Sequence, residues 1–331
     1  MSNPIGSSSS SERELTVAEV GEFPTIARAA SGRRQPTTTL VGPGHDAAIV
    51  AAADGRVAVS TDMLVEGRHF RLDWSSPYDV GRKAVAQNGA DVAAMGARPI
   101  AFLVGLGCPP DTPVSVLDGI SAGIGEAAEA IGAGVVGGDL VQADQVIVAV
   151  TVLGDLQGRA PLLRSEARAG DIVALAGSTG ASAAGLALLE AEHTGFTDLV
   201  DAHRVPSPPY EAGVGAVLAG AHAGTDISDG LLADLGHIAV ASAVAITVEQ
   251  HTVEPGPRLT AAAEELGADP WGWVLTGGED HALAACFPPE VELPDGWRRI
   301  GRVHEGSGVT VDGRTRESPG GWESFGSATS R

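Results

Sequence analysis

Six short acidic segments, most of them beside glycine, constrain this chain more than any other feature. They are Gly44-His45-Asp46, Ser60-Thr61-Asp62, Asn88-Gly89-Ala90-Asp91, Gly137-Gly138-Asp139, Asp226-Ile227-Ser228-Asp229-Gly230 and Gly277-Gly278-Glu279-Asp280. Any one of them is typical of a turn, because Asp and Gly favour turns. Six along most of one chain are hard to explain as separate solvated loops, and carboxylate oxygens together with substrate phosphates suit Mg²⁺. Together they predict a fold that gathers these segments into one metal–phosphate site.

The charge balance excludes several classes of partner and enzyme. The formal net charge is −21 and aromatic residues make up 4% of the chain, so phosphate backbones are repelled and few rings can stack on bases. Nucleic acid is therefore not an expected partner. Lys83 is the single lysine, which rules out both a P-loop and a protein-kinase signature. Metal ions and a few arginines must then neutralise any phosphates, and we expect Lys83 and Arg82 on a solvated helix face.

Length and composition predict a two-domain globular protein. The 331 residues are enough for two domains, and 44% of them are hydrophobic. No apolar run approaches the ~20 residues of a membrane helix, and no signal segment is recognisable at the N-terminus, so no membrane partner is expected. The two cysteines, Cys108 and Cys286, are too few for a disulfide framework or a four-ligand zinc site. A reducing cytoplasm is the expected compartment, with both thiols buried.

The pattern of expected elements divides the chain into three parts. Residues 1–13 form a Ser-rich tail that we expect to be disordered. Residues 14–156 are expected to form an N-terminal domain, and residues 157–331 a C-terminal α/β domain. Both alternate helices with short strands, which predicts a mixed α/β (α+β) fold.

Two local expectations concern the site directly. Asp54-Gly55 lies between the apolar runs 47–52 and 57–61, a pattern that predicts a β-hairpin with Ser60, Thr61 and Asp62 at the end of its second strand. Ser76-Pro77 predicts the start of a helix that runs to about Met95. That helix would place Asp91 on an alanine-lined face, where a carboxylate is costly without a partner or a metal ion.

In combination, the motifs resemble the thiamine-monophosphate kinase family of the aminoimidazole-ribonucleotide synthetase-like superfamily. The matching pieces are Gly21-Glu22-Phe23, Gly44-His45-Asp46-Ala47-Ala48, Ser60-Thr61-Asp62 with the following residues to Phe70, Asp91-Val92-Ala93-Ala94-Met95-Gly96-Ala97, Gly137-Gly138-Asp139, Asp226 to Leu231 and Gly277 to Asp280. The resemblance implies transfer of phosphate from ATP to thiamine monophosphate, giving thiamine diphosphate and ADP. It also implies a two-domain α/β chain in which the N-terminal domain, residues 14–156, binds ATP and Mg²⁺ and forms a homodimer through its sheets.

The resemblance also implies roles for individual residues. The ligands of several Mg²⁺ ions would be Asp46, Ser60, Thr61, Asp62, Asp91, Asp139, Asp226 and Asp229, with Asp46, Asp62 and Asp229 most directly catalytic. ATP would contact Gly138, Asp139, Arg164 and Ser228. Thiamine monophosphate would contact His69, Asp280 and Trp322. Simpler interpretations stay open: His69 as a polar strand residue, Trp322 as a packing residue, Arg164 as a surface arginine, and Ser228 as a hydroxyl bonded within its own turn.

The chemistry expected from such a site is direct in-line transfer. The substrate's phosphate oxygen is ionised near pH 7, so no strong general base is needed and catalysis is positioning and charge stabilisation. His45 stands where the family usually has a second acid, which makes one metal position differ from the family pattern. Two alternatives are another ATP-dependent enzyme of the same superfamily and a non-catalytic metal- or nucleotide-binding dimer.

Overall fold

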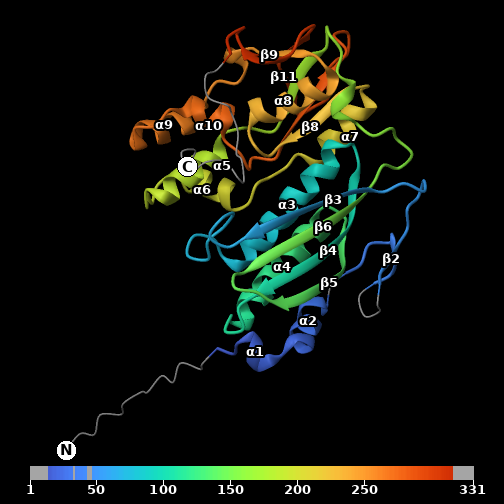
Figure 1. Ribbon diagram of the computed structural model, residues 1–331, viewed down its shortest axis with the longest axis vertical. Coiled ribbons are helices and arrows are strands. Elements are labelled where there is room, and N and C mark those ends of the chain that lie inside the picture. The colour runs from blue at the N-terminus through green and yellow to red at the C-terminus, as the bar shows by residue number, and fades with distance from the viewer. Residues whose placement is uncertain (1–13, 33, 43–46, 316–331) are drawn as a thin grey trace, which may run out of the picture.

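The computed structural model describes residues 14–32, 34–42 and 47–315, which form two lobes that are each built on their own β-sheet (Figure 1). The mixed α/β fold expected from the sequence is confirmed. The expected disordered tail, Asp46 and Trp322 lie outside the described residues. Within the described ranges, no helix is both long and apolar enough to cross a membrane.

The N-terminal lobe is a four-stranded sheet covered by helices on one face. Its strands, in spatial order, are β3 (Ala58–Val65), β6 (Ile147–Asp155), β4 (Arg98–Cys108) and β5 (Gly134–Gln142). The covering helices are α3 (Pro77–Ala94) and α4 (Val114–Ala130). Along β6, every second residue from Val148 to Val152 is fully buried beneath these helices, as the two-residue period of a strand requires.

The other face of this sheet is largely open in the described structure. Val59, Met63, Leu103 and Val141 are exposed there by 60%, 51%, 39% and 54% respectively. The small sheet of β1 (Thr39–Val41) and β2 (Ile49–Val50) packs over only one end of the face. Two short helices pack elsewhere: α2 (Glu22–Ala30) lies against α4 and β5, and α1 (Val17–Val20) lies against α2. Large apolar side chains are thus exposed on strands at both edges and inside this face of the sheet.

The C-terminal lobe is a six-stranded sheet covered on both faces. Its strands, in spatial order, are β12 (Gly308–Val311), β9 (Ala245–Val248), β11 (Trp297–His304), β7 (Ile172–Ala176), β10 (Ala282–Phe287) and β8 (Ala223–Ile227). Its helices are α5 (Ala181–Glu190), α6 (Thr197–Arg204), α7 (Tyr210–Leu218), α8 (Leu231–Ser242), α9 (Pro257–Leu266) and α10 (Pro270–Thr276). The helix α8 buries Leu231, Leu235 and Ile238 completely, at the spacing of one helical face.

The two lobes meet where the end of α3 packs against α7 and β8. A Cβ added to Gly213 of α7 would lie 1.8 Å from the carbonyl oxygen of Ala93, so glycine allows the two helices to approach this closely. Arg98 and Glu211 form an ion pair of 2.5 Å across the same junction. Because β8 is the edge strand of the C-terminal sheet, the contact places its acidic end beside α3.

Two local predictions were wrong in detail. The run that becomes β2 pairs with β1, and β3 pairs with β6, so Asp54-Gly55 does not join a hairpin. As a result Ser60, Thr61 and Asp62 lie in the middle of β3 and not at its end. The helix expected from Ser76 is confirmed as α3, with the Ser76 hydroxyl accepting the backbone N–H of Asp79.

Candidate active site

The first part of the site forms where β3 lies under α3. Alternation along β3 directs Ser60 and Asp62 to the helix-covered face together with the buried Leu64. The Ser60 hydroxyl donates to the Asp91 carboxylate at 2.5 Å, and the Asn88 amide oxygen accepts the backbone N–H of Asp62 at 3.1 Å. One turn of α3 therefore fixes both carboxylates relative to the strand.

The C-terminal lobe adds further carboxylates to the same place. Burial raises the pKa of Asp91 to about 7, and the nearby carboxylates of Asp226 and Asp62 raise it as well, whereas the hydroxyl of Ser60 opposes them. Asp226 on β8 is 3% exposed, and its carboxylate lies 3.4 Å from Nδ1 of the buried His281. Asp62, Asp91 and Asp226, from three elements and both lobes, thus form one cluster whose mutual repulsion a divalent cation would relieve.

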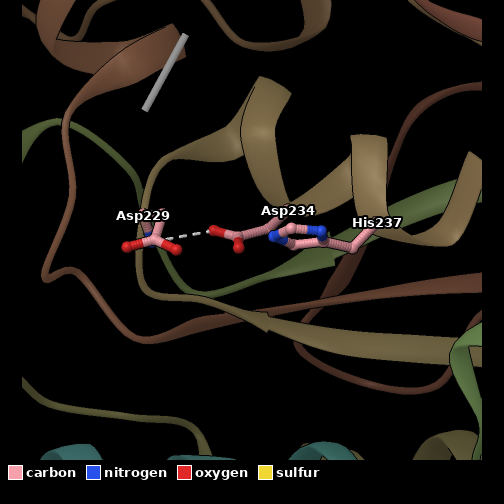
Figure 2. A group of neighbouring side chains, drawn as sticks. All are labelled: Asp229, Asp234 and His237. Carbon is pink, nitrogen blue, oxygen red and sulfur yellow. Dashed lines mark hydrogen bonds between the residues drawn. The ribbon is translucent and has the colours of Figure 1, made fainter. Parts of the chain in front are cut away.

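The turn after β8 carries a second acidic group. Burial raises the pKa of Asp229, with His237 opposing it and Asp226 adding to it. The ligand atoms of Asp229, Asp234 and His237 all lie within 4.8 Å of one another, as Figure 2 shows. The sequence analysis missed Asp234 and His237, although their three-residue spacing on α8 puts both on one helical face.

Asp234 also shapes the turn that presents Asp229. Its Oδ2 accepts the backbone N–H of Asp229 at 3.0 Å (Figure 2). The same oxygen accepts the backbone N–H of Gly230 at 3.1 Å. Burial raises the pKa of Asp234 to about 7, and Asp226 and Asp229 raise it further, while these backbone donors lower it. The carboxylate of Asp234 therefore braces the turn that contains Asp229.

The loop 277–280 packs directly onto this turn. The backbone N–H of Glu279 donates to the carbonyl oxygen of Ser228 at 2.7 Å. A Cβ on Gly278 would lie 2.7 Å from the same oxygen, which explains the glycine at this position. Nearby, the exposed Arg164 donates from Nε to the hydroxyl of Thr225 at 3.0 Å, and its charge lowers the pKa of Asp229. Arg164 and Ser228 are therefore close to the acidic turn, as a nucleotide contact would require.

Asp280 has a clear structural role in addition to the predicted contact with substrate. Its two carboxylate oxygens accept the backbone N–H groups of Gly180 at 2.6 Å and Ser182 at 2.9 Å, at the beginning of α5. Burial raises the pKa of Asp280 to about 6, and these backbone donors act in the opposite direction. A carboxylate is favourable there because the N-terminus of a helix presents free N–H groups.

His69, in the segment between β3 and α3, is held in one tautomer by a hydrogen bond. Its Nδ1 accepts the backbone N–H of Val65 at 3.1 Å, which leaves the proton on Nε2. Burial lowers the pKa of His69; Glu279 raises it and Lys83 lowers it. The ring is therefore neutral at pH 7 and offers one N–H donor.

Lys83 is buried, so the expectation of a solvated position was wrong. The side chain is 2% exposed, and its ammonium lies 3.1 Å from the carboxylate of Glu279 in the opposite lobe. The sequence could not show this, because the partner is 196 residues away along the chain. Arg82, the preceding residue on α3, is 44% exposed and matches the expectation.

Three predicted residues lie away from this cluster. Thr61 is exposed on the open face of the sheet, where its hydroxyl donates to the carbonyl of Val150. Gly138 and Asp139 are on β5, the opposite edge of the sheet from β3. Three steps between neighbouring strands separate those edges, a distance of ~14 Å. The structure thus brings together Ser60, Asp62, Asp91, Asp226 and Asp229, and does not bring Thr61, Gly138 or Asp139 to them within one chain.

Comparison with known proteins gives a consistent family. Residues 44–156 match the family model described as AIR synthase related protein, N-terminal domain, and residues 168–313 match the corresponding C-terminal domain. A thiamine-monophosphate kinase of Mycobacterium tuberculosis is 55% identical over 313 residues, covering 94% of this chain and 93% of the relative. The thiamine-monophosphate kinase of Corynebacterium glutamicum is 43% identical, with 94% and 95% covered.

A solved structure shares the whole architecture. It is described as AaThiL complexed with AMPPCP and TMP, and it is 32% identical with a TM-score of 0.78, over 95% of this chain and all of that one. The likeness therefore spans both lobes of this chain. With both domain models matched and a 55% identical relative over nearly the full length, the chain belongs to the thiamine-monophosphate kinase family.

Proposed function

We propose that this protein transfers the γ-phosphoryl group of ATP to thiamine monophosphate, giving thiamine diphosphate and ADP. The observation that carries the proposal is the cluster of Asp62, Asp91 and Asp226, in which burial and then the neighbouring carboxylates raise the pKa of Asp91 to about 7. Such a concentration of carboxylates suits a reaction between two phosphorylated molecules only when cations are present. Relatives named for this activity, and a neighbour that holds AMPPCP and TMP, support the same reaction.

The donor set fits several Mg²⁺ ions. Ser60, Asp62, Asp91, Asp226 and Asp229 offer hydroxyl and carboxylate oxygens, the ligands that this hard cation prefers. We keep Asp46, Thr61 and Asp139 in the proposed set on the family resemblance alone. When bound, Mg²⁺ supplies the positive charge that neutralises the phosphate oxygens, which a chain with one lysine does not supply itself.

The remaining proposed roles concern binding. The Nε2–H of the neutral His69 is suited to a phosphate oxygen of thiamine monophosphate, with Asp280 and Trp322 as further proposed contacts. Arg164 and Ser228, next to the acidic turn, are proposed to contact ATP together with Gly138 and Asp139.

The chemical step needs little from the protein beyond geometry. A phosphate oxygen of thiamine monophosphate, already ionised near pH 7, forms a bond to the γ-phosphorus as the bond to the bridging oxygen of ADP breaks. No proton has to be removed from the substrate. Asp62 and Asp229 are therefore proposed to bind Mg²⁺ and not to act as general bases. Catalysis then depends on alignment and on charge stabilisation, and no phosphoenzyme is required.

A direct assay tests the proposal. The purified protein is incubated with thiamine monophosphate and Mg-ATP, and thiamine diphosphate is measured by chromatography, with free thiamine as the matched substrate. We expect Mg²⁺-dependent product from thiamine monophosphate and little from thiamine, because thiamine lacks the phosphate that the site holds. Equal turnover of free thiamine, or none of thiamine monophosphate, would overturn the proposed reaction.

The assembly and location are further proposals. The open face around Val59, Met63, Leu103 and Val141 supports a homodimer in which a second copy covers it. Within the chain, we propose the division into residues 14–156 and 157–331. Cys108 and Cys286 are both free and buried, which supports the proposed cytoplasmic location.

A further inference from the structure

The chain's only lysine joins three segments at the boundary between the lobes. Lys83 is on α3, is 2% exposed, and donates from Nζ to the carbonyl oxygen of His69 at 3.0 Å and to Oε2 of Glu279 at 3.1 Å. His69 belongs to the segment between β3 and α3, and Glu279 belongs to the loop 277–280 of the other lobe. A single ammonium group therefore spans the junction.

Lys83 is the charged partner of Glu279. Two histidines also act on this carboxylate more weakly than Lys83: His281, and His203 of α6, whose Nδ1 lies 3.6 Å from Oε2. Burial lowers the pKa of His203 to about 4, and Lys83 lowers it further, so that this histidine is neutral at pH 7. Its Nδ1 is also 3.0 Å from the hydroxyl of Ser182. Among the described residues, the ion pair with Lys83 is thus the main charge compensation for Glu279.

The loop that contains Glu279 also holds the acidic turn after β8 in place. Glu279 has a φ of +64°, which a residue with a side chain rarely adopts, so the loop depends on its surroundings for this conformation. Its backbone N–H holds the carbonyl oxygen of Ser228, and the next residue, Asp280, holds the start of α5. Through its ion pair with Lys83, the carboxylate of Glu279 therefore links α3 to the part of the C-terminal lobe that contains Asp226 and Asp229.

We infer that Lys83 is a positioning residue, which aligns the segment of His69 with the loop 277–280 so that the thiamine-phosphate contacts face the carboxylate cluster. This inference rests on the proposed function for its substrate and deepens it. Lys83 has its two donated hydrogen bonds within the protein, so it acts through His69 and Glu279. Removing it should change substrate binding more than nucleotide binding.

The test uses the full chain and four variants: Lys83→Met, Glu279→Gln, the double variant, and Arg82→Met as control. Arg82→Met removes a positive charge from an exposed site one residue away on the same helix. We expect Lys83→Met and Glu279→Gln each to raise KM for thiamine monophosphate about tenfold or more, with KM for Mg-ATP changed less than about threefold. The control should match the wild type in both constants.

The double variant separates positioning from simple charge compensation. Loss of Lys83 alone leaves a partly buried carboxylate without its cation, and loss of both charges removes that penalty. We therefore expect the thermal midpoint of the double variant to recover toward wild type while its KM for thiamine monophosphate stays raised. Recovery of both together would show that Lys83 only compensates charge and would overturn the inference. If Lys83→Met does not fold, Glu279→Gln carries the same test, because its side chain is 30% exposed.

A second measurement does not depend on turnover. In protein labelled with ¹³C-histidine, the ring signal of His69 can be assigned with His69→Gln. Because Glu279 and Lys83 act on the pKa of this ring in opposite directions, the double variant removes both direct charge effects, and we expect it to shift the signal while Arg82→Met does not. An unchanged His69 signal in the double variant would overturn the inference whether or not the wild type phosphorylates thiamine monophosphate. A wild type without kinase activity, with the signal shifted as expected, would overturn the proposed function and leave the positioning role intact.

Discussion

Asp91→Asn should make the metal-free protein more stable at pH 8 while removing most of its activity. The carboxylate lies among Asp62 and Asp226, accepts a hydrogen bond from Ser60, and has its pKa raised from 3.8 to about 7, first by burial and then by these neighbours. The ionised form is therefore disfavoured in the folded protein. An amide of the same shape removes the charge and keeps an oxygen that can accept from Ser60.

The size of the effect follows from the pKa shift. Three pKa units at 1.36 kcal/mol each give a penalty of about 4 kcal/mol for the ionised side chain. The hydrogen bond from Ser60 opposes this penalty and is already contained in the net pKa of about 7. We therefore expect Asp91→Asn to raise the free energy of unfolding by roughly 4 kcal/mol at pH 8 in the absence of divalent ions.

The effect of Asp91→Asn on the free energy of unfolding depends on pH in a defined way. Below about pH 4 the carboxyl group is protonated in both the folded and unfolded states, so Asp91 carries no penalty. Between pH 4 and 7 the folded state binds the proton more strongly, and the stability of the wild type falls as pH rises. The advantage of Asp91→Asn should accordingly be near zero at pH 4, grow up to pH 7, and be constant above pH 8.

Urea unfolding in the presence of EDTA at pH 4.5, 6 and 8 measures the difference in free energy of unfolding between Asp91→Asn and the wild type. Asp144→Asn, at an exposed position, is the control. The control should stay within about 0.5 kcal/mol of wild type at each pH. Phosphorylation of thiamine monophosphate should fall by about two orders of magnitude in Asp91→Asn, since a proposed ligand of Mg²⁺ is lost. An equal change in stability at pH 4.5 and pH 8, or a loss of stability at pH 8, would refute the reasoning.

Three further predictions concern the metal site, the lobe junction and the assembly. Asp62→Asn or Asp229→Asn should abolish most thiamine diphosphate formation while circular dichroism stays unchanged; wild-type turnover in either would show that the metal ions are held elsewhere. Gly213→Ala should lower the free energy of unfolding by ~1–3 kcal/mol in urea titrations, because the added Cβ meets the carbonyl of Ala93 and overpacks the junction; an unchanged midpoint would contradict this. Light scattering at micromolar concentration should give a dimer for the wild type and a monomer for Met63→Glu on the open sheet face; a monomeric wild type would refute the proposed assembly.

The sequence by itself determined the class of fold and the acidic segments. Local signals act over a few residues, so Ser76-Pro77 predicted the start of α3 correctly. The acidic site residues could be recognised from the sequence because a carboxylate beside alanine and glycine, such as Asp91, is costly to bury without a partner or a metal ion. The expected gathering of these segments is seen for Asp62, Asp91 and Asp226.

The pairing of strands was decided only by tertiary structure. Asp54-Gly55 satisfies the local requirements of a hairpin, but β3 buries Leu64 beneath the helices only by pairing with β6, whose residues follow about a hundred positions later. Packing of an apolar face outweighs the preference of one turn. The same pairing moved Asp62 to the middle of its strand.

The junction between the lobes likewise could not be derived from local pattern. Lys83 looks like a solvated helical cation in sequence, and its burial depends on Glu279, which belongs to the other lobe. His203 is similarly defined by a neighbour distant in the sequence, the carboxylate of Glu279. Short-range preferences decide which residues are helix, strand or turn, whereas the contacts that bring Asp91 to Asp226 and Lys83 to Glu279 form only between elements distant in the chain.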